Sequence, residues 1–361
     1  MLAATELTMS YADGLAAINL QMPPRVPRTE YSAESYHWDL VSAVTGRRIT
    51  SETPDDQRTQ ASRDFERAWN YDFRWSIAVH GEAFGALRTR MGHASYASNG
   101  SDIDRVVTNP FTDPAQVLAF DPWLALGAID RPALVKRFND SYRANCAANP
   151  DAVNMTGIYV TMVSGLIELF GWDMLLVAAG EDAEAFGAMT NRYASWIQQH
   201  FDCLAACEAP VVMVHDDIVW TSGAFIRPAW YRRFIFPNYA KLFAPLRAAD
   251  KRIAYTSDGN FTAFIDDIAA SGVHGFVMEP CTDMAQLAAR YGKTHFFIGN
   301  ADTRILLSGS KDDIRREVER CMAIGKPCPG WFMAVGNHIP ANTPVENALW
   351  YNRCYEELSR R

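Results

Sequence analysis

The second half of the chain alternates between short apolar runs and longer segments in which apolar residues recur at helical spacing. Each apolar run ends at polar residues, Gly or Pro, which is typical of a buried strand. Strands are predicted over 211–214, 252–255, 273–278, 295–298 and 331–335, and helices over 228–247, 261–271, 284–291 and 311–324. Strands that alternate with helices in this way predict βαβ units and a parallel sheet.

Five consecutive units without a GxGxxG or P-loop motif favour a (β/α)8 TIM barrel over a nucleotide-binding sheet. Two more strands are predicted upstream, over 75–79 and 157–161. We expect residues 71–361 to form the catalytic barrel. Residues 1–70 are expected to be an N-terminal helical and extended decoration that packs on it. Residues 85–125 contain many turn formers and are candidates for a lid or rim.

The last predicted strand is followed by a helix-start signal. Thr343 is the expected N-cap, Pro344 the first helical residue, and Glu346 lies three residues after Thr343. This spacing predicts a capping box. Polar residues just before it therefore lie in a short loop at the carboxyl end of a strand, where β/α barrels keep their chemistry.

Composition narrows the function classes. The 361 residues are 48% hydrophobic and 21% charged, with a formal net charge of -8 and no basic run, which argues against nucleic acid. We see no apolar run approaching the roughly 18 residues of a membrane span and no basic start typical of a signal peptide. Seven scattered cysteines without CxxC favour a reduced, cytoplasmic protein.

Every strand end in the second half is polar, and in a barrel these ends meet at one mouth. The residues are His215, Asp216, Asp217, Asp258, Asn260, Glu279, Asn300, Asp302, Asn337 and His338. Such groups can bind a metal, shift one another's pKa or hold a polar substrate. Any one of these residues could instead be a turn residue or a helix cap. Turns and caps do not, however, require a histidine next to consecutive acids, as at His215, Asp216 and Asp217.

Three short motifs at these ends resemble the uroporphyrinogen decarboxylase superfamily, a family of (β/α)8 barrels. They are Ser257-Asp258-Gly259-Asn260, Gly299-Asn300-Ala301-Asp302, and Gly336-Asn337-His338-Ile339-Pro340 continuing to Pro344. The resemblance covers roughly residues 155–355, and the segment 25–30 is also similar to openings in this group.

The resemblance implies one of two chemistries. One branch decarboxylates the acetate arms of a porphyrinogen, and the other moves methyl groups between small methylated compounds and a corrinoid protein, often with zinc. The chain looks closer to the methyltransferase branch. The arginine-rich N-terminal motif of the decarboxylases is not found, and only Arg25 and Arg28 lie in that region.

The zinc ligands usual in the methyltransferases are absent. Thr256 stands at their His position, and Asp258 and Asn337 stand at their two Cys positions. A hard-ligand site built from Asp258 and Glu279 with His215 or His338 is the alternative, since zinc accepts imidazole and carboxylate ligands.

The resulting hypothesis is an O-demethylase type of methyltransferase that takes a methyl group from a small, methoxylated aromatic or similar substrate. The corrinoid would arrive on a partner protein. Removal of an ether methyl needs an acid for the leaving oxygen. We assign catalysis to His215 with Asp216 or Asp217, and to Asn337 and His338. The expected substrate-binding residues are His80, Trp220, Tyr255, Asn260, Asn300 and Asp302.

Two rival hypotheses remain. A cofactor-independent decarboxylase or lyase would need cations at the mouth, for which Arg227, Arg304 and Lys326 are candidates. A non-catalytic barrel that binds a corrinoid or tetrapyrrole would not need His beside paired acids. The oligomeric state is left open, with a homo-oligomer among the alternatives.

Overall fold

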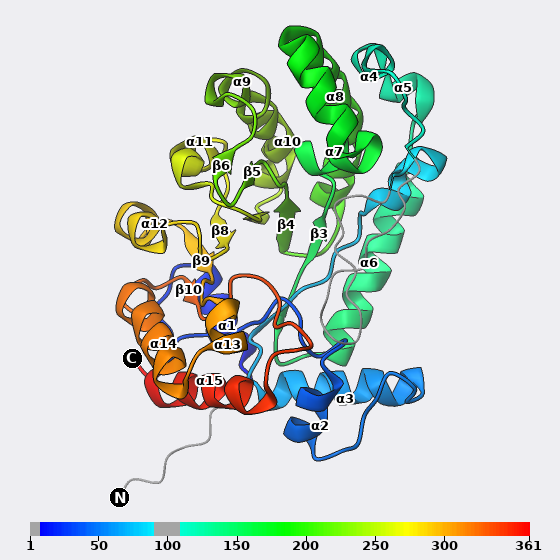
Figure 1. The fold of residues 1–361 in the computed structure, drawn as a ribbon. Helices are drawn as coiled ribbons and strands as arrows, with labels where there is room; N and C mark the ends of the chain where they lie inside the picture. The colour runs from blue at the N-terminus through cyan, green and yellow to red at the C-terminus, as the bar shows by residue number, and fades with distance from the viewer. Residues whose placement is uncertain (1–7, 90–108) are drawn as a thin grey trace, which may run out of the picture.

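Parallel strands form the centre of the computed structural model, which describes residues 8–89 and 109–361 (Figure 1). Six strands pair in the order β10-β9-β8-β7-β4-β3, and every pairing is parallel. They are β3 (Thr156–Ile158), β4 (Val211–His215), β7 (Arg252–Ser257), β8 (Gly275–Met278), β9 (Phe296–Ile298) and β10 (Trp331–Phe332). The predicted parallel sheet is confirmed.

Backbone bridges close this sheet into a ring. β1 (Phe73–Arg74) pairs in parallel with β2 (Val153–Asn154), which runs on into β3 after a single residue. Arg28 bridges in parallel to Tyr71, just before β1, and to Met333, just after β10. The Arg28 segment, β1, the combined β2 and β3, and the five remaining sheet strands together make eight parallel segments around one axis. The predicted (β/α)8 barrel is confirmed.

The N-terminal region thus contributes to the ring as well as to its outside. The Arg28 segment is one of the eight parallel segments, or staves, of the ring. Helices α1 (Tyr11–Ile18), α2 (Trp38–Thr45) and α3 (Asp55–Ala68) lie outside the ring. The Arg28 guanidinium is fully buried, pairs with Glu30 at 2.9 Å, and lies over the rings of Trp69, Tyr351 and Tyr355. This cation–aromatic packing ties the stave to the last helix.

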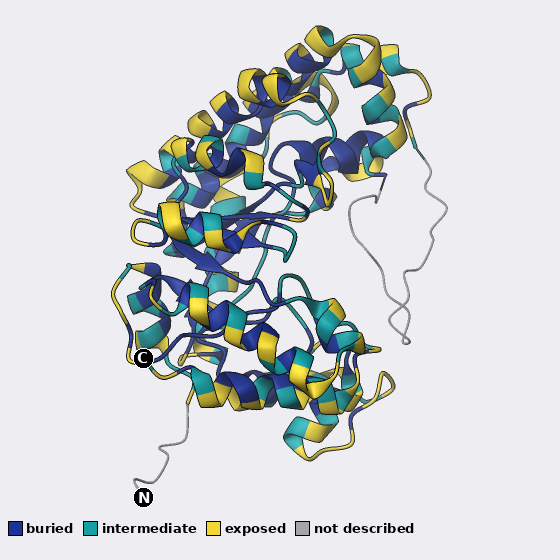
Figure 2. Cartoon of the chain, turned by 60° about the vertical axis from the view of Figure 1, so that its left-hand side comes forward, coloured by how far each residue is buried: buried dark blue, intermediate teal, exposed yellow. Residues whose placement is uncertain are grey.

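The remaining helices cover the outside of the ring and turn their exposed faces to solvent (Figure 2). They are α4 (Pro114–Ala119), α5 (Pro122–Ala125), α6 (Arg131–Ala148), α7 (Val163–Glu181), α8 (Ala183–Ala206), α9 (Pro228–Phe234), α10 (Phe236–Ala248), α11 (Ile265–Ala270), α12 (Met284–Tyr291), α13 (Thr303–Ser308), α14 (Lys311–Gly325) and α15 (Val345–Leu358). Two 3-10 turns, η1 (Gly81–Leu87) and η2 (Thr262–Phe264), and an antiparallel hairpin of β5 (Val219–Trp220) and β6 (Gly223–Ala224) complete the described elements.

Side chains along each strand alternate between two cores. Val211 and Met213 of β4 belong to the cluster that fills the ring, whereas Val212 and Val214 pack with the surrounding helices. The same alternation holds in β7, where Ala254 faces inward and Tyr255 faces outward. Since successive side chains of a strand point to opposite faces, this register continues into the polar residues that follow.

Two sequence predictions need correction. The helix after the last strand begins at Val345 with Pro344 as its N-cap, no side-chain cap bond forms, and the buried Thr343 hydroxyl has no hydrogen-bond partner. The predicted capping box is therefore wrong. Within the described residues, α7 is long and apolar enough by length and composition to cross a membrane, but 67% of its most apolar window is buried in the structure. It is packed as a core helix.

The predicted lid over residues 85–125 is only partly placed. Residues 90–108 lie outside the described residues. The later part forms the short helices α4 and α5, which begin at Asp113 and Asp121 caps that accept backbone hydrogen bonds. Whether this region closes over the barrel stays a prediction.

Candidate active site at the barrel mouth

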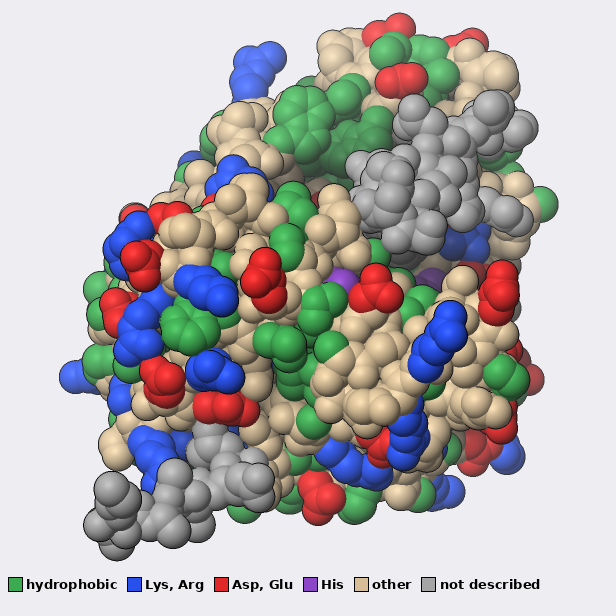
Figure 3. Space-filling model, turned by 60° about the horizontal axis from the view of Figure 1, so that its bottom comes forward, with side chains coloured by type: hydrophobic (Ala, Val, Ile, Leu, Met, Phe, Trp, Pro, Cys, Tyr) green, Lys and Arg blue, Asp and Glu red, His purple; other side chains and the backbone are tan. Residues whose placement is uncertain are grey.

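A small cavity opens at the carboxyl ends of the strands. Its volume is about 30 Å³, room for a few waters or one small group. It is lined by Tyr31, Tyr159, His215, Thr256, Ser257, Asp258, Val277, Met278, Gly336 and Asn337. The lining joins residues from both halves of the sequence. On the face shown in Figure 3, histidine side chains come into view between acidic and hydrophobic ones.

His215 reaches this cavity because of the β4 register. Residues 211 and 213 face into the ring, and so does residue 215, the last of the strand. Its imidazole stacks on Tyr159 with ring centroids 3.8 Å apart, and its Nδ1 lies 3.2 Å from the Tyr159 carbonyl oxygen. That carbonyl can only accept, so Nδ1 carries the proton and donates it. Nε2 is then left with a free lone pair.

Two carboxylates, Asp217 and Asp258, lie near that lone pair, and a third, Glu279, lies next to them. Asp217 Oδ1 lies 3.3 Å from His215 Nε2 and also accepts the Asp258 amide at 2.9 Å. One ligand atom each from His215, Asp217 and Asp258 lie within 4.8 Å of one another. Glu279 accepts the Gly259 amide at 2.8 Å and completes the group. We call His215, Asp217, Asp258 and Glu279 the acidic cluster.

Asn337 links the acidic cluster to the last strand. Its Nδ2 donates to Glu279 Oε1 at 2.9 Å and approaches Asp258 Oδ1 at 3.4 Å. The Asn337 loop is therefore held against β7 and β8. The Thr256 hydroxyl, also in the lining, is buried and has no hydrogen-bond partner. An orphaned hydroxyl in a polar cavity is available to a ligand.

Two carboxyl groups of the acidic cluster, those of Asp217 and Asp258, keep much of their protonated form at neutral pH. Desolvation in the barrel, with repulsion from Asp216 and Glu279, raises the pKa of Asp217 to about 7. Desolvation followed by repulsion from Asp217 and Glu279 raises the pKa of Asp258 to about 8, although its side chain still opens to solvent. Burial lowers the pKa of His215. A neutral imidazole facing a carboxyl at 3.3 Å leaves room for one shared proton.

No arginine or lysine lines this cavity within the described residues. The rival cations are occupied elsewhere. Arg304 pairs with Asp302 at 2.6 Å, and Lys326 donates to the Leu358 carbonyl at 2.9 Å. Arg227 is exposed beside α9. The negative charge of the acidic cluster is therefore balanced by protons or by an added cation.

Asp216 and Tyr255 were predicted at the mouth, but the structure places both on the outer side of the ring. Asp216 is fully buried and accepts from the Met162 and Ser164 amides at 3.2 and 2.7 Å, at the start of α7, and from the Tyr239 hydroxyl. Tyr255 is also fully buried, with its hydroxyl 3.2 Å from the Asp216 carbonyl. Each of them directly follows a residue whose side chain points into the ring, so its own side chain points outward.

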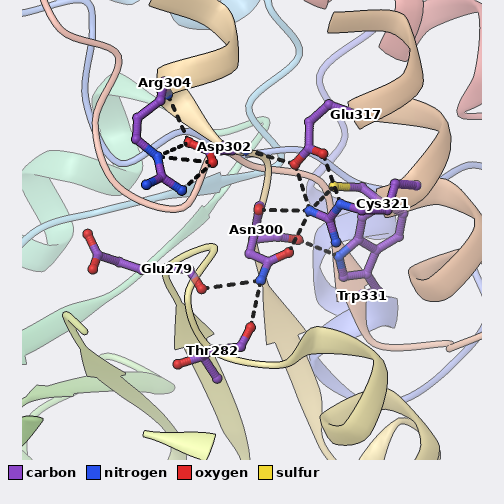
Figure 4. Close-up of polar contacts among 10 residues, drawn as sticks. Glu279, Thr282, Asn300, Asp302, Arg304, Glu317, Cys321 and Trp331 are labelled. Atoms are coloured by element: carbon purple, nitrogen blue, oxygen red, sulfur yellow. Dashed lines mark hydrogen bonds and ion pairs between the residues drawn. The ribbon is translucent and has the colours of Figure 1, made fainter. Parts of the chain in front are cut away.

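The end of β9 is likewise structural (Figure 4). Asn300 Nδ2 donates to the Glu279 and Thr282 carbonyls at 3.2 and 3.1 Å, and its Oδ1 accepts from Arg320 at 3.1 Å. Asp302 caps α13 and pairs with Arg304. Both side chains are saturated by protein contacts, and neither lines the cavity.

The other predicted binding residues are dispersed. Asn260 Oδ1 accepts a hydrogen bond from the Thr262 amide at 3.1 Å, a local turn contact just before η2. His338 bonds to the Asn337 side chain at 2.7 Å and lies outside the lining. Trp220 is 46% exposed on the β5–β6 hairpin, where it groups with Trp172 and Phe225. His80 stacks on Tyr159 with centroids 6.1 Å apart and lies outside the cavity lining.

Sequence reasoning missed the two tyrosines of the lining. Tyr159 lies in a predicted strand. Its side chain points to the same face as residue 157, and this alternation was not used to place Tyr159 at the barrel mouth. Tyr31 comes from the N-terminal stave, and its ring packs on Trp75 with centroids 4.9 Å apart. No local signal marks it, because only ring closure brings residues 27–31 beside the last strand.

The family of the chain is shown by comparison with known proteins. The family model described as "Uroporphyrinogen decarboxylase (URO-D)" matches residues 160–357, more than half of the chain. The chain belongs to the uroporphyrinogen decarboxylase family. The matched range begins at the cavity side of β3 and runs through every member of the acidic cluster to α15.

Curated relatives in this family are distant. The uroporphyrinogen decarboxylase of Syntrophotalea carbinolica is 28% identical over 138 residues, which cover 38% of this chain and 40% of that protein. That of Thermus thermophilus is 29% identical over 155 residues, 43% of each. The chain thus spans about half, or less, of the curated relatives it matches here.

A solved structure matches over almost the full length. A methyltransferase from Methanosarcina mazei superposes with a TM-score of 0.67 at 16% identity and covers 97% of this chain and 99% of that one. The likeness supports the barrel and its N-terminal stave as one shared fold.

Proposed function

We propose that the chain is a methyltransferase that takes a methyl group from a small methylated substrate, of the methyl ether type, and delivers it to a corrinoid held by a partner protein. The observation that carries the proposal is the acidic cluster, which stores protons at neutral pH inside a cavity lined by no described cation. The full-length likeness to a methyltransferase supports it.

The cluster fits the acid step of ether cleavage. As the bond between methyl carbon and ether oxygen breaks, the methyl group leaves toward the acceptor and the bonding electrons stay on oxygen. That oxygen needs a proton, and we assign its supply to the pair formed by His215 Nε2 and Asp217 Oδ1, which lie 3.3 Å apart. An acid with a pKa of about 7 is well matched to this transfer near neutral pH.

His215 is held in place for this role by two contacts. Its Nδ1 donates to the Tyr159 carbonyl, which fixes the tautomer, and its ring is stacked on Tyr159, which fixes the plane. Asp217 is positioned by the Ser164 hydroxyl, which accepts from the Asp217 amide at 2.8 Å. The acid pair is therefore pre-organised before substrate enters.

The same residues could also bind a divalent cation through oxygen and nitrogen ligands. They do not provide the thiolate ligands of the zinc site that the family resemblance implied. His215, Asp217 and Asp258 would hold the ion, with the orphaned Thr256 hydroxyl beside them. This oxygen-rich donor set suits a hard cation or a carboxylate-bound zinc. When bound, the ion would act as a Lewis acid toward the leaving oxygen.

Metal analysis of the purified protein tests this part. A stoichiometric ion that is lost in Asp258→Ala and retained in Asp302→Ala would support the cation site. Protein that is metal-free after purification, and that takes up neither zinc nor magnesium in a thermal-shift titration, would leave the shared proton as the acid.

A decarboxylase is the second candidate, because the curated relatives carry that name. It is less consistent with the charges. Arg25 is 5% exposed and bidentate to Asp72 at 2.5 and 2.7 Å, and Arg28 is fully buried against Glu30. Neither guanidinium is free for a carboxylate substrate, and the cavity lining is itself acidic.

Product analysis distinguishes the candidates. Purified protein is incubated with cob(I)alamin and a set of methoxylated benzenes, and separately with uroporphyrinogen. We expect the absorbance of methylcobalamin to appear and a free phenol to form in equal amount. Release of carbon dioxide from uroporphyrinogen, without methyl transfer, would contradict the proposal. Tight tetrapyrrole binding with neither product would favour the non-catalytic barrel.

A further inference from the structure

A second cavity lies outside the ring, behind Tyr159. Its volume is about 470 Å³, within the usual range for small-molecule sites. It is lined by Ala78, Val79, His80, Glu82, Ala83, Ile129, Asp130, Ala133, Leu134, Arg137 and His200. These residues come from the segment after β1, the first turns of α6 and the later part of α8. We call this the side cavity.

Two ring contacts connect the lining of the side cavity to the acidic cluster. His80 borders the side cavity and stacks on Tyr159, which in turn stacks on His215. The centroid distances are 6.1 and 3.8 Å. His215 is not among the residues that line the side cavity. The two cavities have no lining residue in common.

An unsatisfied histidine marks the side cavity as a site. His200 is only 4% exposed, and its Nδ1 has no hydrogen-bond partner. Burial and the nearby Arg137 lower the pKa of His200 to about 4, so the ring is neutral near pH 7. A buried polar atom without a partner costs free energy, and a ligand that bonds to it would recover that cost.

The hydrogen-bond donors left in the side cavity favour an anion. Its two carboxylates are already engaged, since Glu82 pairs with Arg88 at 2.6 Å and Asp130 caps α6 through the Ala133 amide at 3.0 Å. Across residues 8–89 and 109–361, Arg137 forms no ion pair, and its exposed guanidinium borders the cavity. The donors that remain for a ligand are therefore Arg137 and His200.

The rest of the lining is apolar. Val79, Ile129 and Leu134, with several alanines, form walls that a hydrocarbon or aromatic body can fill. We propose that the side cavity binds a small organic carboxylate, with its carboxyl group on Arg137 and His200 and its apolar body against these walls. This site is independent of the proposed methyl transfer.

Binding of benzoate, measured by calorimetry on the full-length protein, tests the proposal. We expect saturable binding of one benzoate, and a loss of affinity of about tenfold or more in Arg137→Ala, because a charge-assisted contact is removed. Lys136→Ala is the matched control. Lys136 neighbours Arg137 on α6, carries the same charge and pairs with Asp140 away from the cavity, so its removal should leave affinity within about twofold.

Two further arms locate the ligand and its charge. Ile129→Trp, which fills the cavity, should abolish benzoate binding, and benzylamine, with a cation on the same ring, should not bind. Absence of benzoate binding to the wild type, or equal loss in Lys136→Ala and Arg137→Ala, would overturn the proposal. Unchanged binding in Ile129→Trp, checked as folded by circular dichroism, would place the ligand elsewhere and also overturn it.

Discussion

Acidic residues lie at two places on the barrel mouth, the end of β9 and the neighbouring ends of β4, β7 and β8. They are paired with arginines at the first place and face a histidine at the second. At β9, Asp302 pairs with Arg304 and Glu317 pairs with Arg320, both at 2.6 Å (Figure 4). At the acidic cluster, Asp217 and Asp258 face His215 and one another, with no described arginine or lysine in the cavity lining.

The difference appears in the pKa directions. Burial alone would raise the pKa of Asp302, but the Arg304 guanidinium and amide outweigh it and hold that pKa below its usual range. The pKa of Asp217 and that of Asp258 are raised to about 7 and about 8. Neutralised acids build the fold, and acids left without cations keep protons that a reaction can use.

The largest expected effect is on catalysis. Asp217→Asn removes the carboxyl that shares a proton with His215 and should lower single-turnover methyl transfer to cob(I)alamin about 100-fold or more. The near-isosteric Asp302→Asn, at the neutralised end, should change the rate less than about threefold. Equal rates for both variants would show that the two strand ends do not differ in function.

Stability should show the reverse order. Asn300→Ala deletes two donors to buried carbonyls and the acceptor of Arg320, and should lower the free energy of unfolding by about 2–3 kcal/mol in urea titrations. The rate per folded molecule should stay within about threefold of the wild type. A large catalytic loss at unchanged stability would return Asn300 to the substrate-binding role that its sequence motif suggested.

The smallest effect concerns pH. The folded protein holds the Asp258 proton up to about pH 8, whereas the unfolded chain loses it near 3.8, so stability falls as pH rises between those values. Asp258→Asn removes this term and should melt roughly 2 °C above the wild type at about pH 8.5, with a smaller gain at about pH 5.5. Calorimetry at both pH values checks it.

Asp302→Asn is the comparison for that measurement. Its lowered pKa means that the ionised carboxylate stabilises the fold above the unfolded pKa of 3.8, so the variant should be destabilised to the same degree at both pH values. A gain with rising pH in this variant would contradict the assignment of opposite pKa shifts.

Periodicity in the sequence was enough to predict the barrel and most of its strand ends. Strands β4, β7, β8, β9 and β10 and helices α12 and α14 lie where the apolar runs and the helical spacing put them, whereas the β5–β6 hairpin was not predicted. The closing stave at Arg28 was not visible, because its single bridged residue sits in a Pro-rich segment without an apolar run. Ring closure is a long-range property that local pattern does not encode.

The candidate site was predictable only in part, and the missing step was strand register. His215, Asp258 and Glu279 continue the inward alternation of residues 213, 256 and 277, so the sequence alone could have separated them from Asp216 and Tyr255. Asn300 and Asp302 could not have been excluded in this way. Their partners Arg320 and Arg304 neutralise them only through packing of α13 and α14 on the ring.

The most direct test of the central claim, that the acidic cluster works by holding a proton near neutral pH, is the pH dependence of single-turnover methyl transfer between about pH 6 and about pH 9. We expect a rate that falls as pH rises, with a midpoint at about 7 to 8, and a low, nearly flat profile for Asp217→Asn. A wild-type rate that rises over this range, or an Asp217→Asn profile that keeps the same midpoint, would contradict it.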